Sequence, residues 1–180
     1  QPRGTGWCSD GSLEKEEDGS SSGRSIMSDR VSVLFVCLGN ICRSPMAEAL
    51  LRHHAHATGH EGVHIDSAGV GGWHAGESPD SRMVATAKKN GVVVEGSARK
   101  ITAADLNAFD LILCSDTEIL DQVRSLGNGS ARIELMLDYH PELSGENVPD
   151  PYYGGGDGFI HVFEILNESC RGLLDKIRRS

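Results

Sequence analysis

Residues 33–45, VLFVCLGNICRSP, join an apolar run to a short loop that ends at a serine and a proline. The β-branched and aromatic residues predict a buried strand. Gly39 and Asn40 tolerate the positive φ of a tight loop, and Pro45 favours the first turn of a helix. Backbone N–H groups and the dipole at a helix N-terminus bind anions, so this order of elements predicts a phosphate-binding loop.

Cys37 and Arg43 lie at the two ends of this loop. Helix N-termini and neighbouring cations stabilise thiolates, so Cys37 is expected to be a nucleophile at neutral pH. The planar guanidinium of Arg43 can bind two oxygens of one phosphate group, whereas a lysine offers a point charge. Ser44 is placed to donate a hydrogen bond to the sulfur. The alternative is a buried Cys37 that packs as a small apolar side chain, with a chance spacing to Arg43.

Residues 36–48, VCLGNICRSPMAE, resemble the signature of the low molecular weight protein tyrosine phosphatases. Further segments similar to that family follow in family order: 66–69 (DSAG), 73–76 (WHAG), 79–82 (PDSR), 98–99 (AR), 109–110 (FD) and 148–153 (VPDPYY). The resemblance covers residues 31–180. It implies a phosphoric monoester hydrolase that acts on phosphotyrosine and carries its phosphate-binding loop after the first strand.

Strand and helix patterns alternate along the chain, which predicts a parallel sheet covered by helices on both faces. Strands are expected at 31–36, 63–66, 109–114 and 132–136, and helices at 45–58, 79–90, 117–126 and 159–178. With the resemblance, this order predicts an α/β fold, a three-layer αβα sandwich with a central four-stranded parallel sheet. Residues 1–30 are rich in Gly, Ser and acidic residues, so a disordered N-terminal extension is expected before a phosphatase domain at 31–180.

Asp150 is the candidate general acid. Pro149 and Pro151 flank it and limit the movement of its backbone. Taken alone, this segment suits a turn aspartate better, and the resemblance to the family reverses that preference. The implied mechanism forms a phosphocysteine on Cys37 while Asp150 protonates the leaving oxygen, and Asp150 then activates the water that hydrolyses the intermediate. No metal or other cofactor is implied.

The resemblance also indicates which residues bind the substrate. Loop residues Leu38, Gly39, Asn40, Ile41, Cys42 and Ser44 would surround the phosphate, and Trp73, Tyr152 and Tyr153 would form the walls of a slot deep enough for phosphotyrosine. Flat aromatic faces of this kind stack on a phenyl ring. Trp73 could instead be a packing residue of the core.

Support for the loop is expected from hydrogen bonds between Asn40, Ser44 and Ser67. The family often has a histidine two residues before Ala98, where this chain has Gly96. We therefore expect a somewhat looser loop, and a gain of stability when a histidine replaces Gly96. Asp116 is expected where the family's histidine would find its partner.

Cys37 and Cys42 are also candidates for redox regulation. The family resemblance suggests that they form a disulfide that protects the nucleophile from irreversible oxidation. The alternative is that Cys42 remains a buried thiol that never pairs.

The composition limits the partners and the compartment. A formal net charge of −9 argues against nucleic acid or an anionic membrane as partner. Five cysteines without framework spacing suit a reducing compartment, so a cytoplasmic location is expected. The histidines at 53, 54, 56 and 60 lack ligands at a recognisable metal spacing, so no metal site is expected. The expected partners are phosphotyrosine-containing proteins or small aryl phosphates, bound by a monomer with weak self-association at most.

Three other interpretations remain open. Related arginine phosphatases carry Thr at the position of Ile41, so Ile41 favours the tyrosine branch. An arsenate reductase of related fold needs further redox cysteines close to the site, and Cys114 and Cys170 lack the expected close pairing. A phosphotyrosine-binding module without activity would be expected to have lost Cys37 or Asp150.

Overall fold

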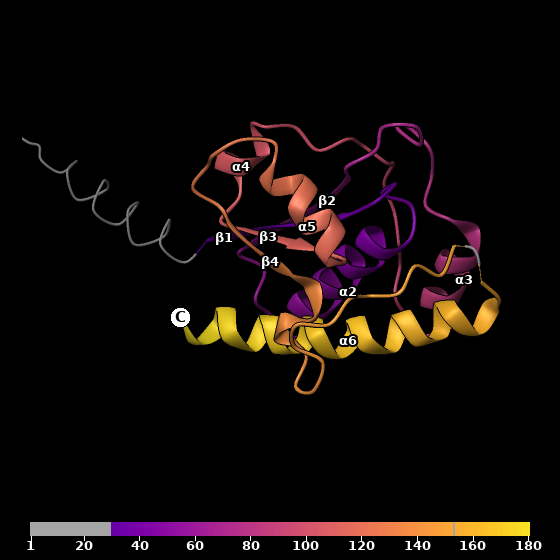
Figure 1. The fold of residues 1–180 in the computed structure, drawn as a ribbon. Helices are drawn as coiled ribbons and strands as arrows, with labels where there is room; N and C mark the ends of the chain where they lie inside the picture. The colour runs from indigo at the N-terminus through magenta and orange to yellow at the C-terminus, as the bar shows by residue number, and fades with distance from the viewer. Residues whose placement is uncertain (1–29, 153) are drawn as a thin grey trace, which may run out of the picture. The chain divides into compact units, whose positions relative to one another are not determined.

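The strand predicted before the phosphate-binding loop is an inner strand of a four-stranded parallel sheet with the order β2-β1-β3-β4 (Figure 1). The strands are β1 (Val31–Cys37), β2 (Val63–Gly69), β3 (Leu111–Cys114) and β4 (Arg132–Leu135). This is a computed structural model, and it describes residues 30–152 and 154–180. The extension predicted at residues 1–30 lies outside the described residues apart from Arg30, and Tyr153 lies outside them too.

The register of the sheet brings the strand ends together. Cys37 pairs with Gly69, and Val36, one residue earlier in β1, pairs with Cys114. Cys114 in turn pairs with Leu135. Because Gly69, Cys114 and Leu135 each end their strands, the segments that follow all four strands leave the sheet at one edge. Ligands bind at this edge of open parallel sheets.

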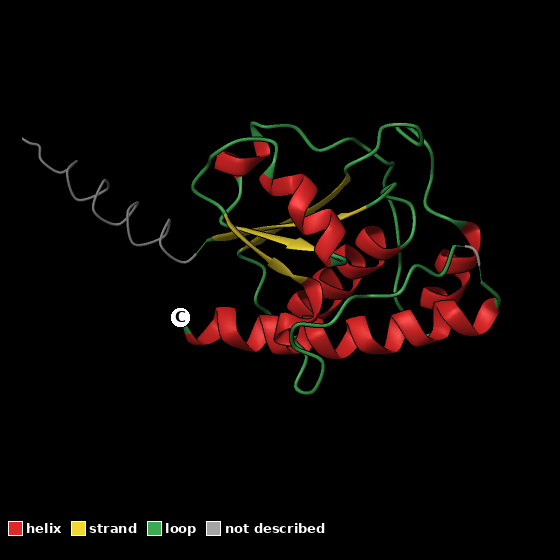
Figure 2. Cartoon of the chain, viewed as in Figure 1, coloured by secondary structure: helices red, strands yellow, loops and turns green. Residues whose placement is uncertain are grey.

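Helices cover both faces of the sheet (Figure 2). One layer holds α2 (Arg43–Ala57), α3 (Ser81–Lys89), α6 (Gly156–Arg179) and the 3₁₀ helix η1 (Met136–Tyr139), and the other holds α4 (Asp105–Ala108) and α5 (Thr117–Arg124). Successive side chains of β1 point to opposite faces of the sheet. Val33 and Phe35 therefore pack against the first layer, and Leu34 and Val36 pack against the second. The predicted three-layer αβα sandwich is confirmed.

Several element boundaries differ from the prediction. β2 continues to Gly69 because it pairs with the whole length of β1, although its polar residues hide the strand pattern. α2 begins at Arg43, and α6 begins at Gly156, before the aromatic residue that was expected to start it. α3 begins only at Ser81, since the Asp80 side chain accepts the N–H of Arg82 at 2.8 Å and caps the helix. The short helices α4 and η1 were not predicted.

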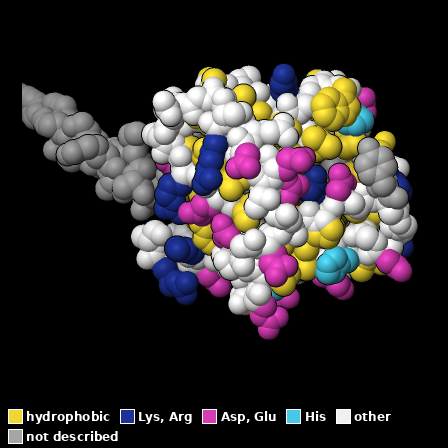
Figure 3. All heavy atoms as spheres, in the orientation of Figure 1, with side chains coloured by type: hydrophobic (Ala, Val, Ile, Leu, Met, Phe, Trp, Pro, Cys, Tyr) yellow, Lys and Arg dark blue, Asp and Glu magenta, His cyan; other side chains and the backbone are white. Residues whose placement is uncertain are grey.

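Charge is unevenly distributed over the surface. Acidic side chains are scattered over the middle of the face in Figure 3, and basic side chains gather near the C-terminal end of α6, whose last turn contains Lys176, Arg178 and Arg179. The chain as a whole is acidic, with a formal net charge of −9. Binding of phosphate at the predicted loop would therefore depend on a local field and not on the net charge. None of the helices in residues 30–152 and 154–180 has the length and hydropathy of a membrane span.

Candidate active site

The loop between β1 and α2 depends on the conformation of Asn40. Its φ is +61°, the one positive φ of a residue other than glycine in the described part of the chain. The Asn40 side chain donates from Nδ2 to Ser44 Oγ at 2.8 Å and to Ser67 Oγ at 3.0 Å. Its Oδ1 accepts the backbone N–H of Arg99 at 2.9 Å. Three hydrogen bonds thus offset the cost of the left-handed backbone conformation.

Cys37 lies at the end of β1 and is only 3% exposed. Its sulfur is 3.0 Å from Ser44 Oγ. Ser44 Oγ accepts the hydrogen bond from Asn40, so its own single proton is available for the sulfur or for the carbonyl oxygen of Ala68, 3.4 Å away. A hydroxyl that donates to sulfur stabilises a thiolate. The predicted contact between Ser44 and Cys37 is present.

The Arg43 guanidinium is held from two sides. Nη1 donates to Asp116 Oδ2 and to the carbonyl oxygen of Val148, each at 2.9 Å, and Nη2 lies 3.5 Å from Asp150 Oδ2. Arg43 is 4% exposed, so these partners compensate a buried charge. Asp116 is itself fixed, because its Oδ1 accepts the N–H of Ile119 at the start of α5. Asp116 is thus the partner of Arg43, a role that the sequence did not indicate.

A cavity of about 140 Å³ lies beside Gly96, where the family often has a histidine. Its lining includes Asn40, Glu48, Asp66, Ser67 and Glu95, and does not include Asp116, which contradicts the expected place of that residue. Gly96 has a φ of +103°, a conformation that strains any side chain. Replacing Gly96 with His is therefore expected to cost stability, contrary to the expectation from the sequence.

A second cavity, of about 60 Å³, opens next to the loop. It is lined by the loop residues Leu38, Gly39, Ile41, Cys42 and Arg43 and by Trp73, His74, Asp150 and Tyr152. Trp73 is 63% exposed, which excludes the alternative that it packs in the core. Asn40, Ser44 and Ser67 are buried and do not line this cavity; they support the loop.

His74 is a wall residue that the sequence analysis missed. Its ring centroid lies 6.2 Å from that of Trp73 and 6.4 Å from that of Tyr152. The Nδ1 atom is 2.9 Å from Glu77 Oε1, which fixes the orientation of the ring. A Cβ added to Gly39 would lie 2.8 Å from the His74 ring, so glycine allows the ring to pack closely on the loop. The one feature of the sequence that could have indicated His74 as a wall residue was its position directly after Trp73.

Asp150 is anchored through both carboxylate oxygens. Oδ1 accepts the N–H of Tyr152 at 3.0 Å, and Oδ2 faces Arg43. Arg82 holds the adjoining wall, because it donates to the carbonyl oxygen of Tyr152 at 3.1 Å and its guanidinium lies 5.5 Å from the Tyr152 ring centroid. Asp80 in turn binds Arg82 at 2.9 Å. The structure thus brings Asp150 and Tyr152 to the cavity, next to Arg43.

The cysteines differ in their electrostatic environment. Burial, followed by the charges of Asp80, Cys37 and Asp150, raises the pKa of Cys42 to about 12. Cys37 and Cys42 are both free thiols. No group of three or more His, Cys, Asp or Glu in residues 30–152 and 154–180 is arranged to hold a metal ion.

Iodoacetate at neutral pH is expected to modify Cys37 and to leave Cys42, Cys114 and Cys170 almost unmodified. Burial raises the pKa of Cys114 to about 12 and that of Cys170 as well, so these thiols stay protonated. Cys8, the fifth cysteine of the chain, is first replaced with serine, and peptide mass spectrometry then gives the rate of modification at each of the other four. Inorganic phosphate should slow the reaction of Cys37. Equal rates of modification at Cys37 and Cys42 would contradict the expectation that Cys37 is the nucleophile.

The sequence of this chain is similar to that of known phosphatases. Residues 32–180 match the family model described as low molecular weight phosphotyrosine protein phosphatase. The protein of that name from Schizosaccharomyces pombe is 43% identical over 155 residues, 84% of this chain and 99% of that protein. The low molecular weight protein-tyrosine-phosphatase YfkJ of Bacillus subtilis is 41% identical over 153 residues, 83% of this chain and 97% of that protein.

Solved structures show the same fold. The crystal structure of YfkJ aligns with a TM-score of 0.76 at 38% identity, over 83% of this chain and 96% of that chain. A crystal structure of a drosophila arginine phosphatase aligns with a TM-score of 0.76 at 33% identity, over 80% of this chain and 96% of that chain. The family model matches from the second residue of β1 to the end of the chain. The chain therefore belongs to the low molecular weight phosphotyrosine protein phosphatase family and is a hydrolase of the protein tyrosine phosphatase class.

Proposed function

We propose that this enzyme hydrolyses phosphotyrosine in proteins, and small aryl phosphates, with Cys37 as nucleophile, Arg43 as phosphate ligand and Asp150 as general acid and base. The observation that carries the proposal is the guanidinium of Arg43. It ends the loop that begins after Cys37 and lies between Asp116 and the carboxylate of Asp150. This buried cation thus contacts the proposed acid, Asp150, and stands at the end of the loop that follows the proposed nucleophile, Cys37.

The reaction proceeds in two steps. The Cys37 thiolate attacks phosphorus, the sulfur–phosphorus bond forms, and the ester oxygen leaves with the proton of Asp150. The Asp150 carboxylate then takes a proton from water, the water oxygen bonds to phosphorus, and the sulfur leaves as a thiolate. Loop N–H groups and Arg43 stabilise the charge on the phosphoryl oxygens in both transition states. Ser44 stabilises the thiolate before attack and as it leaves.

The aromatic walls support the choice of substrate. Trp73, His74 and Tyr152 stand at the cavity beside the loop, where their rings can stack on the phenyl group of phosphotyrosine. A phosphoserine side chain is too short to reach the loop and contact these walls together. Tyr153, expected in the same wall, lies outside the described residues.

An arginine phosphatase is the second candidate, because one structural relative is named as such. Ile41, which lines the cavity, distinguishes the two, since the arginine branch carries Thr at this position. The test compares kcat/KM for peptides with phosphotyrosine, phosphoserine or phosphoarginine in one sequence, for wild type and Ile41→Thr. We expect wild type to prefer phosphotyrosine and Ile41→Thr to gain on phosphoarginine. A wild-type preference for phosphoarginine would overturn the proposal.

Two assays on the same protein distinguish a phosphatase from an arsenate reductase and from a binding module without activity. Vanadate is expected to inhibit the hydrolysis of p-nitrophenyl phosphate, since it occupies a phosphate site. Arsenate reduction with a thiol donor is expected to stay at the background rate. Reduction of arsenate without hydrolysis of the ester would identify a reductase, and binding of phosphotyrosine without either activity would identify a binding module.

Further parts of the proposal concern redox regulation, the location in the cell and the oligomeric state. A reversible Cys37–Cys42 disulfide is supported by the position of both thiols in one loop, and peroxide inactivation that dithiothreitol reverses in wild type, but not in Cys42→Ala, tests it. A cytoplasmic location is supported by the free state of Cys37, Cys42, Cys114 and Cys170. We expect a monomer that associates weakly at most, which sedimentation velocity measures.

A further inference from the structure

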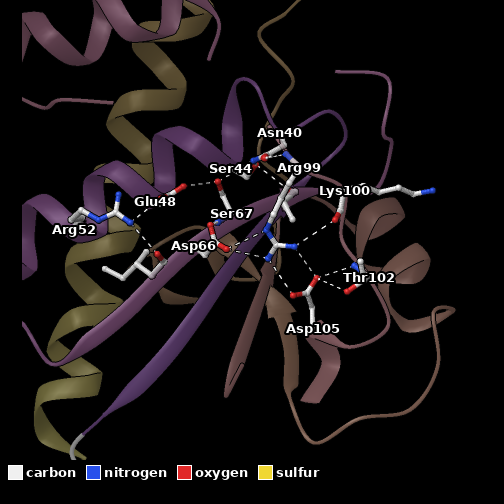
Figure 4. A network of polar contacts seen from close by, with 12 residues as sticks. Asn40, Ser44, Glu48, Arg52, Asp66, Ser67, Arg99, Lys100, Thr102 and Asp105 are labelled. Atoms are coloured by element: carbon white, nitrogen blue, oxygen red, sulfur yellow. Dashed lines mark hydrogen bonds and ion pairs between the residues drawn. The ribbon is translucent and has the colours of Figure 1, made fainter. Parts of the chain in front are cut away.

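Behind the active-site loop lies a polar network that the reaction does not use directly (Figure 4). It begins at Asn40, whose positive φ shapes the loop. In the described part of the chain, the hydrogen bond that Asn40 Oδ1 accepts comes from the backbone N–H of Arg99. The Arg99 N–H, together with the two hydroxyls that accept from Nδ2, therefore sets the orientation of the Asn40 amide.

The guanidinium of Arg99 is bound by two carboxylates from two different elements. Nε and Nη2 lie 3.2 and 3.1 Å from Asp66 Oδ2 on β2, while Nη1 and Nη2 lie 3.0 and 3.2 Å from the two oxygens of Asp105 on α4. The Asp105 side chain is 10% exposed and the Arg99 side chain 35%. Figure 4 shows this guanidinium between the two acids, with the arginine backbone directed to Asn40.

Asp105 is committed to this arrangement. Its Oδ2 also accepts the backbone N–H of Thr102 at 2.8 Å. Burial alone would raise the pKa of Asp105, but the hydrogen bonds from Arg99 and Thr102 outweigh it and lower the pKa. The carboxylate is therefore ionised at neutral pH and holds the segment from Arg99 to Thr102 as one piece.

The backbone of Arg99 is also fixed to the sheet. Its carbonyl oxygen accepts the N–H of Gly69 at 2.9 Å, and the N–H of Ile101 donates to the carbonyl oxygen of Gly69 at 2.8 Å. Gly69 pairs in register with Cys37. The backbone of residues 99–101 is thus hydrogen-bonded to β2, the strand that pairs with Cys37. Asp66 and Asp105 hold the Arg99 side chain.

We infer that Arg99 is a positioning residue for Cys37, acting through Asn40 and Ser44, an inference that rests on the proposed role of Cys37 as nucleophile. Each link is a short contact: Arg99 N–H to Asn40 at 2.9 Å, Asn40 to Ser44 at 2.8 Å, and Ser44 to the sulfur at 3.0 Å. Gly96 offers no side chain on the neighbouring side of Asn40, where a cavity lies instead. The clamp of Asp66 and Asp105 on Arg99 therefore sets how well Ser44 faces the thiolate.

The test measures the reactivity of the sulfur itself. Arg99→Ala is expected to lower kcat by about 10- to 100-fold with KM nearly unchanged, because a small misplacement of a reacting group has effects of this size. The pH profile of Cys37 alkylation by iodoacetate is expected to move to higher pH, since Ser44 donates less well to the thiolate. Arg99→Lys keeps the positive charge but loses the planar guanidinium that binds both carboxylates. Its kcat and its alkylation profile should therefore lie between those of Arg99→Ala and wild type.

Arg132→Ala is the matched control. Arg132 on β4 also pairs with an acid, Glu134, but it is outside the network. It should change neither kcat nor the alkylation profile. Asp105→Asn tests the clamp without removing Arg99, and near-UV circular dichroism and melting temperatures show which variants are folded.

The outcomes separate this inference from the proposed function. A wild-type enzyme that forms no phosphocysteine would overturn the proposed function itself. If wild type forms phosphocysteine, while folded Arg99→Lys and Asp105→Asn keep the wild-type kcat and alkylation profile, the positioning role is wrong. A fall in melting temperature without a change in the alkylation profile also contradicts it, because it would show a structural role alone.

Discussion

Cys37→Ser is expected to lower kcat/KM for p-nitrophenyl phosphate by at least about 10³-fold. A serine hydroxyl is not ionised at neutral pH, and the described side chain in contact with the sulfur, Ser44, offers a hydroxyl and not a base. Binding of inorganic phosphate should change little, since Arg43 and the loop N–H groups remain. Steady-state kinetics and calorimetric titration with phosphate measure the two quantities.

The control for this variant is the same chemical change elsewhere. Cys8→Ser, in the segment before residue 30, should keep full activity. Retention of more than about a tenth of the wild-type activity by Cys37→Ser would show that another group attacks phosphorus, which contradicts the mechanism. Loss of phosphate binding together with activity would instead indicate that the loop had collapsed, and Cys37→Ala then repeats the test.

Asp150→Asn is expected to lower kcat by about 10²–10⁴-fold for phenyl phosphate, the range that general acid catalysis contributes. The fall should be smaller for p-nitrophenyl phosphate, because p-nitrophenolate leaves readily without a proton. Asparagine keeps an oxygen for the N–H of Tyr152 and so preserves the loop. Measuring kcat across phenyl phosphates with leaving groups of different basicity gives the dependence directly.

Asp157→Asn is the matched control, since Asp157 is an exposed acid in the first turn of α6 and does not line the cavity. It should leave kcat unchanged for both esters. An equal fall for both esters in Asp150→Asn would mean that the residue binds or orients without donating a proton. No fall for phenyl phosphate would exclude Asp150 as the acid.

The centre of the fold could be predicted from local sequence. The apolar run before Cys37, the loop residues Gly39 and Asn40, and Pro45 specify a strand, a loop and a helix start within a few residues, and the structure has this order. The hydrogen bonds of Asn40 with Ser44 and Ser67 followed from the family resemblance. Such features are predictable because the residues that determine them are adjacent in the chain or belong to a recognised motif.

Features that depend on distant segments were missed. Asp116 meets Arg43 across 73 residues, and nothing in the local pattern around Asp116 indicates a buried partner. α4 is a single turn of four residues, too short for hydrophobic periodicity. The left-handed backbone at Gly96, which leads us to expect a loss of stability with histidine, could not be predicted from the local sequence either. Tertiary contact decides each of these.

The central claim is that the phosphoryl group passes through the sulfur of Cys37, and rapid-quench mass spectrometry tests it most directly. Enzyme mixed with p-nitrophenyl phosphate and quenched within one turnover is digested, and the peptide carrying residues 33–45 is sequenced. We predict a burst of p-nitrophenol, with one phosphoryl group bound to Cys37 in wild type and none in Cys37→Ser. A phosphoryl group on any other side chain, or turnover without a phosphorylated peptide, would contradict the account.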